Sequence, residues 1–250
     1  MNQALAAVLG AVTGAIIGSY IATLVQRWGR GEGASTGRSR CDGCARTLRA
    51  WELVPLASAL VSRGRCRTCG TRIDPLHWQV ELASTFLGGV ALALAPDLRG
   101  AALALFGWLL LPLIWLDLRH YWLPDRLTVL LAAVGLLIGQ FVSLEPLLPR
   151  LIGGAAGCLS LWLLAFLYRR LRGREGLGGG DPKLLGAIGL WLGWVPLPSV
   201  LLLAALLGLL AALPGGLRAT RRLPFGTMLG IAAWLVAAIW VGRGGAPLTL

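Results

Sequence analysis

Residues 101–117 read AALALFGWLLLPLIWLD, an apolar run whose only charged side chain is the last one, Asp117. A helix that spans a lipid bilayer needs about 20 consecutive apolar residues, with a range of roughly 17–25. The run is therefore predicted to be a membrane helix. A carboxyl group is costly to keep at the end of such a helix, so Asp117 marks a candidate functional position.

The rest of the chain repeats this pattern of apolar runs. Hydrophobic residues make up 56% of the 250 residues and charged residues only 14%, whereas a soluble domain averages roughly 25% charged residues. We therefore predict an all-α fold, a polytopic membrane helix bundle with about eight transmembrane segments. The segments are expected at 4–25, 78–96, 101–117, 127–143, 151–168, 184–195, 199–213 and 225–241. Segment 184–195 is the weakest of these, and is tilted, broken or continuous with the next.

Positive charge is distributed unevenly between the loops. The net charge is +12, and a basic chain can indicate a nucleic-acid-binding protein. The basic residues instead fall on alternate loops, as the positive-inside rule predicts for a membrane protein. With the N-terminus outside, the loops 26–77, 118–126, 169–183 and 214–224 are cytosolic and hold all 23 basic residues except Arg99, Arg150 and Arg243. We expect a multi-pass protein with a lipid bilayer around it and no nucleic-acid partner.

Three parts are expected along the chain. Residues 1–25 form a first transmembrane helix, residues 26–77 a cytosolic loop, and residues 78–250 a transmembrane core. Segment 4–25 is predicted to be a membrane helix and not a cleavable signal, because its positive charges follow the apolar run instead of preceding it.

The cytosolic loop carries two CxxC pairs, CDGC at 41–44 and CRTC at 66–69, separated by 21 residues. Thiols stay reduced in the cytosol, so metal binding is favoured over disulfides. Two CxxC turns can close a tetrahedral shell around one structural Zn²⁺, which gives the ligands Cys41, Cys44, Cys66 and Cys69. Cysteines without metal, or redox-active ones, are the alternative. Cys158 lies inside an apolar run and is interpreted as a packing residue.

Four acidic residues lie within or next to predicted membrane segments, namely Glu81, Asp117, Asp125 and Asp181. Asp117 and Asp181 both sit at cytosolic ends of segments and therefore share one membrane depth. Two carboxyl groups that face each other cannot both ionise comfortably, so one keeps a proton. The ionised group can then activate water while the protonated one polarises a peptide carbonyl, as in aspartic proteases.

Structural roles remain open for both aspartates at this point. Asp181 is followed by Pro182, a pair that is also typical of a helix start. Asp117 can pair with Arg119 at the membrane interface. The glycines before Asp181, including Gly178 and Gly180, favour the catalytic interpretation, because they let an extended peptide approach the backbone closely.

Several longer motifs resemble those of one family, the prepilin peptidases, which are GxGD-type intramembrane aspartic proteases. Residues 178–193, GGGDPKLLGAIGLWLG, resemble the GxGD motif of that family, and residues 114–128, IWLDLRHYWLPDRLT, resemble its other aspartate motif. The stretch around the second cysteine pair, residues 52–70, and the exit from that loop, residues 73–82, are also similar, as are residues 14–20.

The resemblance implies a set of site residues. It assigns Asp117 and Asp181 as catalytic, with Asp125 as the rival for the first, and the four loop cysteines as zinc ligands. Lys183 is expected to assist electrostatically or to anchor at the membrane interface. The chain departs from the family pattern at Ala22, where an asparagine is usual, and at Pro182, where an apolar residue is usual.

The resemblance also implies the reactions. The first is removal of the leader peptide from type IV prepilins or type II secretion pseudopilins at the cytosolic face of the bacterial inner membrane. The second is N-methylation of the new N-terminus with S-adenosylmethionine, whose binding residues the sequence does not indicate. A non-enzymatic zinc-ribbon membrane scaffold or channel is the alternative, and an archaeal-type preflagellin peptidase is disfavoured by the CxxC loop.

Overall fold

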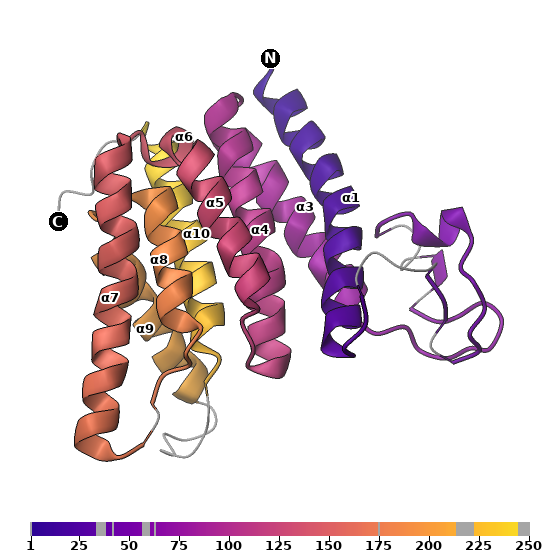
Figure 1. Cartoon of the computed structure of the whole chain (residues 1–250). Helices are drawn as coiled ribbons and strands as arrows, with labels where there is room; N and C mark the ends of the chain where they lie inside the picture. The colour runs from indigo at the N-terminus through magenta and orange to yellow at the C-terminus, as the bar shows by residue number, and fades with distance from the viewer. Residues whose placement is uncertain are drawn as a thin grey trace. The chain divides into compact units, whose positions relative to one another are not determined.

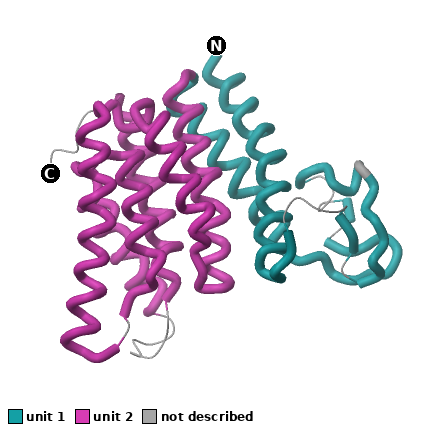
Figure 2. The backbone as a smooth tube through the Cα atoms, viewed as in Figure 1, with its two compact units in different colours: residues 1–96 teal, residues 97–250 magenta. Residues whose placement is uncertain are grey.

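The computed structural model describes residues 2–33, 39–41, 43–56, 61–62, 64–174, 176–213 and 223–244. Within these residues the regular structure is helical, apart from two isolated β-bridges in the cysteine loop. The predicted all-α fold is therefore confirmed. The helices belong to two compact units, residues 1–96 and residues 97–250, which Figure 2 distinguishes by colour. Most of residues 214–224, expected to be a basic cytosolic loop, lie outside the described residues.

The first unit consists of two long helices and the cysteine loop between them. Helix α1 (Gln3–Gly29) is capped at its N-terminus by Asn2, whose side chain accepts a hydrogen bond from the N–H of Ala4. After the loop, which includes the short 3-10 helix η1 (Ala50–Leu53), helix α3 (Leu76–Leu94) packs against α1 (Figure 1).

Small residues allow α1 and α3 to approach each other closely. Gly10, Gly14 and Gly18 recur every four residues and so lie on one face of α1. A Cβ atom on Gly18 would lie only 2.8 Å from the Cα atom of Glu81. The two backbones are therefore nearly in contact, as in small-residue interfaces between membrane helices.

The second unit contains the remaining helices (Figure 1). They are α4 (Leu98–His120), α5 (Asp125–Ile138), α6 (Gln140–Ser143), α7 (Leu147–Arg172), α8 (Asp181–Leu192), α9 (Leu197–Ala212) and α10 (Phe225–Gly242). Helix α10 packs against α4 and α9, while α8 packs against α7 and α5. The Trp191 side chain on α8 is fully buried, and its ring centroid lies 4.8 Å from that of Phe106 on α4. Its indole N–H donates a hydrogen bond to the carbonyl of Leu131 on α5.

Four of the described helices, α1, α4, α7 and α10, are long and apolar enough to cross a membrane. Helix α8 has 12 residues, and at 1.5 Å per residue it extends over roughly 18 Å, less than the bilayer core of about 30 Å. This agrees with the weakness of the predicted segment 184–195. The predicted segment 127–143 is divided at Gly139 into α5 and α6. The total of eight spans remains a prediction.

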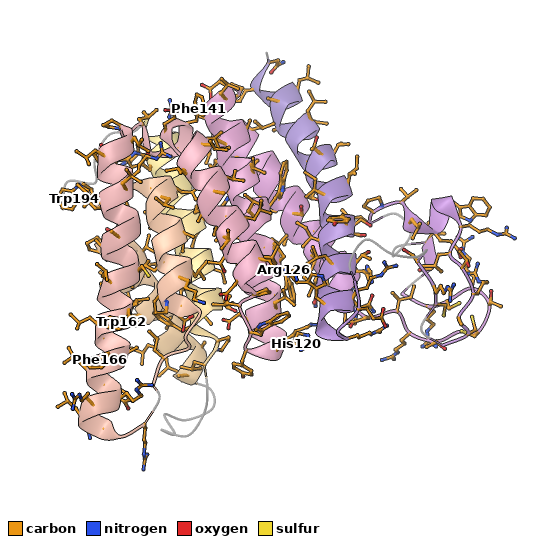
Figure 3. All side chains as sticks on the ribbon, in the orientation of Figure 1. His120, Arg126, Phe141, Trp162, Phe166 and Trp194 are labelled. Atoms are coloured by element: carbon orange, nitrogen blue, oxygen red, sulfur yellow. The ribbon has the colours of Figure 1, made fainter. Side chains whose placement is uncertain are left out.

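The outer face of α7 carries exposed apolar side chains. Trp162 and Phe166 stack with ring centroids 5.7 Å apart and project from this helix (Figure 3). Neighbouring side chains such as Leu159 and Leu163 are also more than half exposed. A soluble protein rarely exposes an apolar surface of this extent, whereas lipid matches it. The second unit therefore belongs in a membrane.

Arg150 is a buried cation at the start of α7. Its guanidinium group donates hydrogen bonds to the carbonyls of Gly135, Leu136 and Leu190, the bond to Leu190 measuring 3.0 Å. These carbonyls belong to the last turns of α5 and α8, where helical N–H partners run out. The Gly135 carbonyl also accepts a hydrogen bond of 2.8 Å from the N–H of Gly139. Arg150 thus caps two helix C-termini, where a positive charge is also favoured by the helix dipole.

We predict that Arg150→Met destabilises the protein by about 2–4 kcal/mol, because three carbonyl groups lose their hydrogen bonds to the buried guanidinium group. The measurement is thermal unfolding in detergent micelles, followed by circular dichroism. Arg126→Met is the matched control, because Arg126 is exposed on α5. Equal unfolding temperatures for the two variants would contradict the capping role of Arg150.

Candidate active site and metal centre

Asp117 lies in the last turn of α4. The helix ends after His120, where Tyr121 adopts a left-handed conformation with φ of 51°, and Pro124 cannot supply an N–H group to continue it. The Asp117 side chain is only 6% exposed. Its Oδ2 atom accepts a hydrogen bond of 2.7 Å from the backbone N–H of Thr227 and lies 3.1 Å from the Thr227 hydroxyl. The first turn of α10 therefore holds this carboxyl group.

Asp181 is the first residue of α8 and is only 4% exposed. Its Oδ2 atom accepts a hydrogen bond of 3.0 Å from the N–H of Gly178, which precedes the helix. The N-cap position is occupied by Gly180, and proline follows Asp181 within the first turn. The Asp181 carboxyl group thus bonds to the preceding glycine turn.

The backbone segments that carry the two aspartates converge on Leu123, in the link between α4 and α5. A Cβ atom on Gly180 would lie 2.8 Å from the Leu123 side chain, and one on Gly226 would lie equally close to it. A Cβ atom on Gly226 would also lie 3.1 Å from Asp117 Oδ2. Glycine at both positions therefore leaves room for the Leu123 side chain between the segments.

The carboxyl groups of Asp117 and Asp181 are close enough to repel each other electrostatically. Both are buried, so little water is available to screen the repulsion. Two such groups are most stable when they share one proton, which leaves one acid and one carboxylate at neighbouring positions. This arrangement has the chemical groups that aspartic proteases use to hydrolyse a peptide bond.

Asp125 and Lys183 lie outside this buried pair. Asp125 begins α5, and its Oδ1 atom forms an ion pair of 2.7 Å with Lys183 Nζ. Their side chains are 67% and 54% exposed, respectively. Asp125 therefore does not face Asp181 in place of Asp117. The guanidinium group of Arg119 lies over the Trp115 ring, 6.0 Å from its centroid.

The contacts from α10 and Leu123 were not predicted from the sequence. Thr227, Gly226 and Leu123 all touch or frame the acids. In the sequence, a Gly-Thr pair at the start of an apolar run is only a weak signal, because such residues are common near helix ends. Their importance appears only when α10 packs against α4.

The cysteine loop contains two similar turns. The N–H of Cys41 bonds to the carbonyl of Arg46, and the N–H of Cys66 bonds to that of Thr71, each at 2.9 Å. The residue after each CxxC pair, Ala45 or Gly70, has a positive φ, of 56° or 71°. Each turn thus folds its two thiols to one side.

The four thiol sulfurs form one compact cluster. The Sγ atoms of Cys41, Cys44, Cys66 and Cys69 all lie within 4.8 Å of one another, and those of Cys41 and Cys69 are 3.7 Å apart. A tetrahedral ion with metal–sulfur bonds of about 2.3 Å requires sulfurs about 3.8 Å apart. The cluster therefore has the dimensions needed to hold one metal ion.

The ionisation of the cluster also favours a cation. Backbone N–H groups of Cys69 and Thr68 lower the pKa of the Cys66 thiol to about 6. A backbone hydrogen bond from Arg46 favours the thiolate of Cys44, but desolvation and contacts with the other thiols raise its pKa to about 11. The Cys44 thiol thus resists ionisation beside the other thiols, and a metal ion would remove that resistance.

An ion pair supports the first cysteine turn. The Arg46 guanidinium donates two hydrogen bonds, of 3.0 and 2.7 Å, to the two carboxylate oxygens of Glu52. These bonds, with a further one from the Arg49 N–H, lower the pKa of Glu52 to about 2. Glu52 is therefore ionised at neutral pH and fixes η1 against the turn.

Glu81, the fourth predicted acid, lies in the first unit. It is buried on α3 with 5% exposure, and its Oε2 atom accepts a hydrogen bond of 2.9 Å from the N–H of Leu56.

Two family models match the chain. Residues 104–213 match the model of the type IV leader peptidase family, and residues 12–95 match the bacterial peptidase A24 N-terminal domain. These two regions contain the aspartates and the cysteine loop, respectively. No solved structure matches the chain.

Curated relatives cover most of the chain. A protein of Burkholderia pseudomallei named prepilin leader peptidase/N-methyltransferase is 44% identical over 211 residues, which are 82% of this chain and 67% of the relative. Proteins with the same name are 43% identical in Aeromonas hydrophila and 37% identical in Pseudomonas aeruginosa, over 81% of this chain and 71% of each relative. The resemblance found in the sequence is thus confirmed, and the chain belongs to the type IV leader peptidase family.

Proposed function

We propose that this protein cleaves the leader peptide from type IV prepilins or type II secretion pseudopilins, and that it methylates the new N-terminus. The observation that carries the proposal is the burial of the Asp117 and Asp181 carboxyl groups on backbone segments that converge on Leu123. A zinc-ribbon scaffold or channel would gain nothing from this pair, because burying two acids together costs folding free energy.

The proposed cleavage uses the two aspartates as one acid–base unit. The ionised member removes a proton from water, which attacks the scissile carbonyl carbon, while the protonated member transfers its proton to the carbonyl oxygen, giving a neutral diol. The member that is now a carboxylate then removes a proton from a diol hydroxyl, and the member that is now an acid gives its proton to the leaving nitrogen as the C–N bond breaks. At the Gly178–Gly180 turn, a Cβ atom on Gly179 would meet open space, so an extended peptide can lie against this backbone.

Thr227 is proposed as a positioning residue for Asp117. Its N–H and hydroxyl groups both contact Oδ2, and the hydroxyl also lies 3.0 Å from the carbonyl of Ile114. These bonds fix the carboxyl orientation and favour its ionised form. The lysine of the Asp125–Lys183 ion pair is proposed to act at the membrane interface and not on the substrate carbonyl.

The cysteine cluster is proposed to hold Zn²⁺ in a structural role. Four sulfur ligands complete a tetrahedral shell and leave no position for water or substrate. Thiols that bind a metal ion must stay reduced, which is expected in the cytosol. We therefore place the protein in the inner membrane with its N-terminus outside, residues 26–77 forming a cytosolic zinc-binding part, and residues 78–250 forming the protease core.

We predict that Asp117→Asn and Asp181→Asn each reduce leader cleavage to below about one-hundredth of the wild-type rate, because acid–base catalysis typically contributes about 10²–10⁴-fold. The assay incubates purified protein in detergent with a prepilin and measures the mass of the products. Asp125→Asn is the matched control, since that exposed carboxylate should affect the rate only slightly. Cleavage at the wild-type rate by a folded Asp181→Asn variant would refute the proposed chemistry.

Removal of the Thr227 hydroxyl should impair cleavage less than removal of an aspartate. We expect Thr227→Val to lower kcat about tenfold, the effect of one lost hydrogen bond to a charged group. The acidic limb of the pH–rate profile should move to higher pH, because the ionised Asp117 loses a donor. Thr227→Ser should restore both properties. A lower kcat with an unchanged pH profile would indicate a purely structural role.

The zinc content of the cysteine loop, residues 26–77, is also predicted. Purified protein should contain about one zinc ion per chain, and Cys66→Ser should lose it, because metal binding supplies about 10–16 kcal/mol to small zinc subdomains. Elemental analysis measures the metal, and limited proteolysis within residues 26–77 reports loop unfolding. Cys158→Ser, on α7, should keep both zinc and protease resistance. Retention of full zinc by Cys66→Ser would exclude the four-cysteine site.

A further inference from the structure

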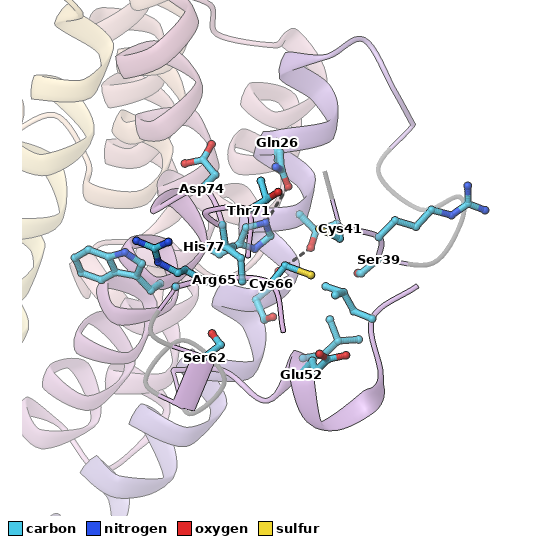
Figure 4. A pocket seen from close by; sticks show the side chains of 18 of the residues that line it. Gln26, Ser39, Cys41, Glu52, Ser62, Arg65, Cys66, Thr71, Asp74 and His77 are labelled. Carbon is cyan, nitrogen blue, oxygen red and sulfur yellow. Dashed lines mark hydrogen bonds between the residues drawn. The ribbon is translucent and has the colours of Figure 1, made fainter. Parts of the chain in front are cut away.

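The first unit contains a cavity of about 930 Å³. Its described walls are the C-terminal half of α1, the cysteine loop and the first two turns of α3 (Figure 4). Across one wall, His77 Nε2 lies 2.8 Å from Gln26 Oε1, which joins α3 to α1. Small-molecule sites commonly have volumes of about 300–1,000 Å³. The cavity is therefore large enough for a ligand the size of a nucleoside conjugated to an amino acid.

Glu81 is the one deeply buried acid among the described cavity residues. One of its oxygens accepts the hydrogen bond from Leu56, and the acid has no part in the cleavage chemistry assigned to α4 and α8. A carboxylate buried on an apolar helix is costly unless a cation or further donors face it. A positively charged ligand in the cavity would supply this compensation.

The position of Glu81 is fixed by the contact between α1 and α3. Gly18 allows the α1 backbone to pass the Cα atom of Glu81 so closely that a Cβ atom would lie 2.8 Å away. Ser19, Tyr20 and Thr23, which follow Gly18 on α1, line the cavity. The acid therefore lies on a rigid two-helix wall, while the loop forms the other side.

The other walls offer aromatic and basic groups. Tyr20, Trp51 and Trp78 are each between 43% and 55% exposed and line the cavity. Aromatic faces can stack on a purine ring and also attract cations. Arg27 and Arg65 are among the arginines of the lining, and guanidinium groups bind carboxylates well. The cavity thus presents groups for an aromatic ring, a carboxylate and a cation.

We propose that this cavity binds S-adenosylmethionine and that the Glu81 carboxylate faces its positively charged sulfur. The proposal rests on the proposed function, because N-methylation requires a methyl donor. When bound, the donor supplies a methyl group: its S–CH₃ bond breaks as an N–CH₃ bond forms to the uncharged amine. The positive charge then passes from sulfur to nitrogen, and a neutral thioether remains. Glu81 stabilises the positive charge electrostatically and undergoes no change itself.

The decisive property is charge discrimination by Glu81. S-adenosylhomocysteine is the neutral thioether that remains after transfer, so it lacks the group that Glu81 recognises. We expect the zinc-loaded full-length protein in detergent to bind S-adenosylmethionine more tightly than S-adenosylhomocysteine, as measured by isothermal titration calorimetry. Glu81→Gln should weaken the binding of S-adenosylmethionine about tenfold or more and leave that of S-adenosylhomocysteine nearly unchanged. Glu145→Gln, outside the cavity, is the matched control and should bind both like the wild type.

A second variant tests the cavity independently of the acid. Thr23→Phe places a ring inside the lining and should weaken the binding of both ligands about tenfold. Thr13→Phe introduces the same ring on an exposed part of α1 and should have no effect. Zinc content and circular dichroism verify that each variant is folded.

Three outcomes would overturn the inference. The first is a wild-type protein that cleaves a prepilin leader but does not bind S-adenosylmethionine, a result that leaves the protease assignment intact. The second is Glu81→Gln weakening both ligands equally, which would assign Glu81 a structural role only. The third is binding of phosphatidylglycerol micelles, but not of S-adenosylmethionine, in a manner that Thr23→Phe abolishes. The arginines would then serve an anionic lipid headgroup.

Discussion

Two carboxyl groups in one desolvated site repel each other, and residues 97–250 hold Asp117 and Asp181 in that relation despite the cost. The cost is offset locally, because backbone N–H groups of Thr227 and Gly178 each donate to one of the acids. The packing around them follows from this constraint. Glycine at 180 and 226 lets two backbone segments lie close to Leu123, so the end of α4 and the starts of α8 and α10 come together there.

The distant ends of the same helices are held by a different charge. Arg150 binds the last carbonyls of α5 and α8, so a single buried guanidinium fixes two helices whose opposite ends carry Asp125 and Asp181. Trp191 adds a hydrogen bond between α8 and α5 and a ring contact to α4. The short helix α8 is thus restrained along its length, which fixes the position of the buried Asp181 at its first residue.

The first unit has a smaller apolar core and is held together by backbone contacts and the cysteine cluster. The glycine face of α1 brings it against α3, and two cysteine turns close the loop between them. A loop of this size has too small a core to fold by burial alone, so four sulfurs around a metal ion are a physically reasonable substitute. The relatives that share this unit are named for methylation as well as cleavage, and the cavity beside Glu81 offers a place for that second reaction.

The helical class and the two CxxC turns could be predicted from the amino-acid sequence, because apolar runs and short ligand spacings are local properties. The long motifs also led to Asp117 and Asp181 as the proposed catalytic pair. The sequence predicted 127–143 as one segment, whereas the helix divides at Gly139, and it indicated nothing about Thr227, Gly226 or Leu123. It also left Asp125 as a rival for Asp117. Only the tertiary structure separated these residues, because burial and partners depend on which helices pack together: α10 covers Asp117, while Asp125 faces outward and pairs with Lys183.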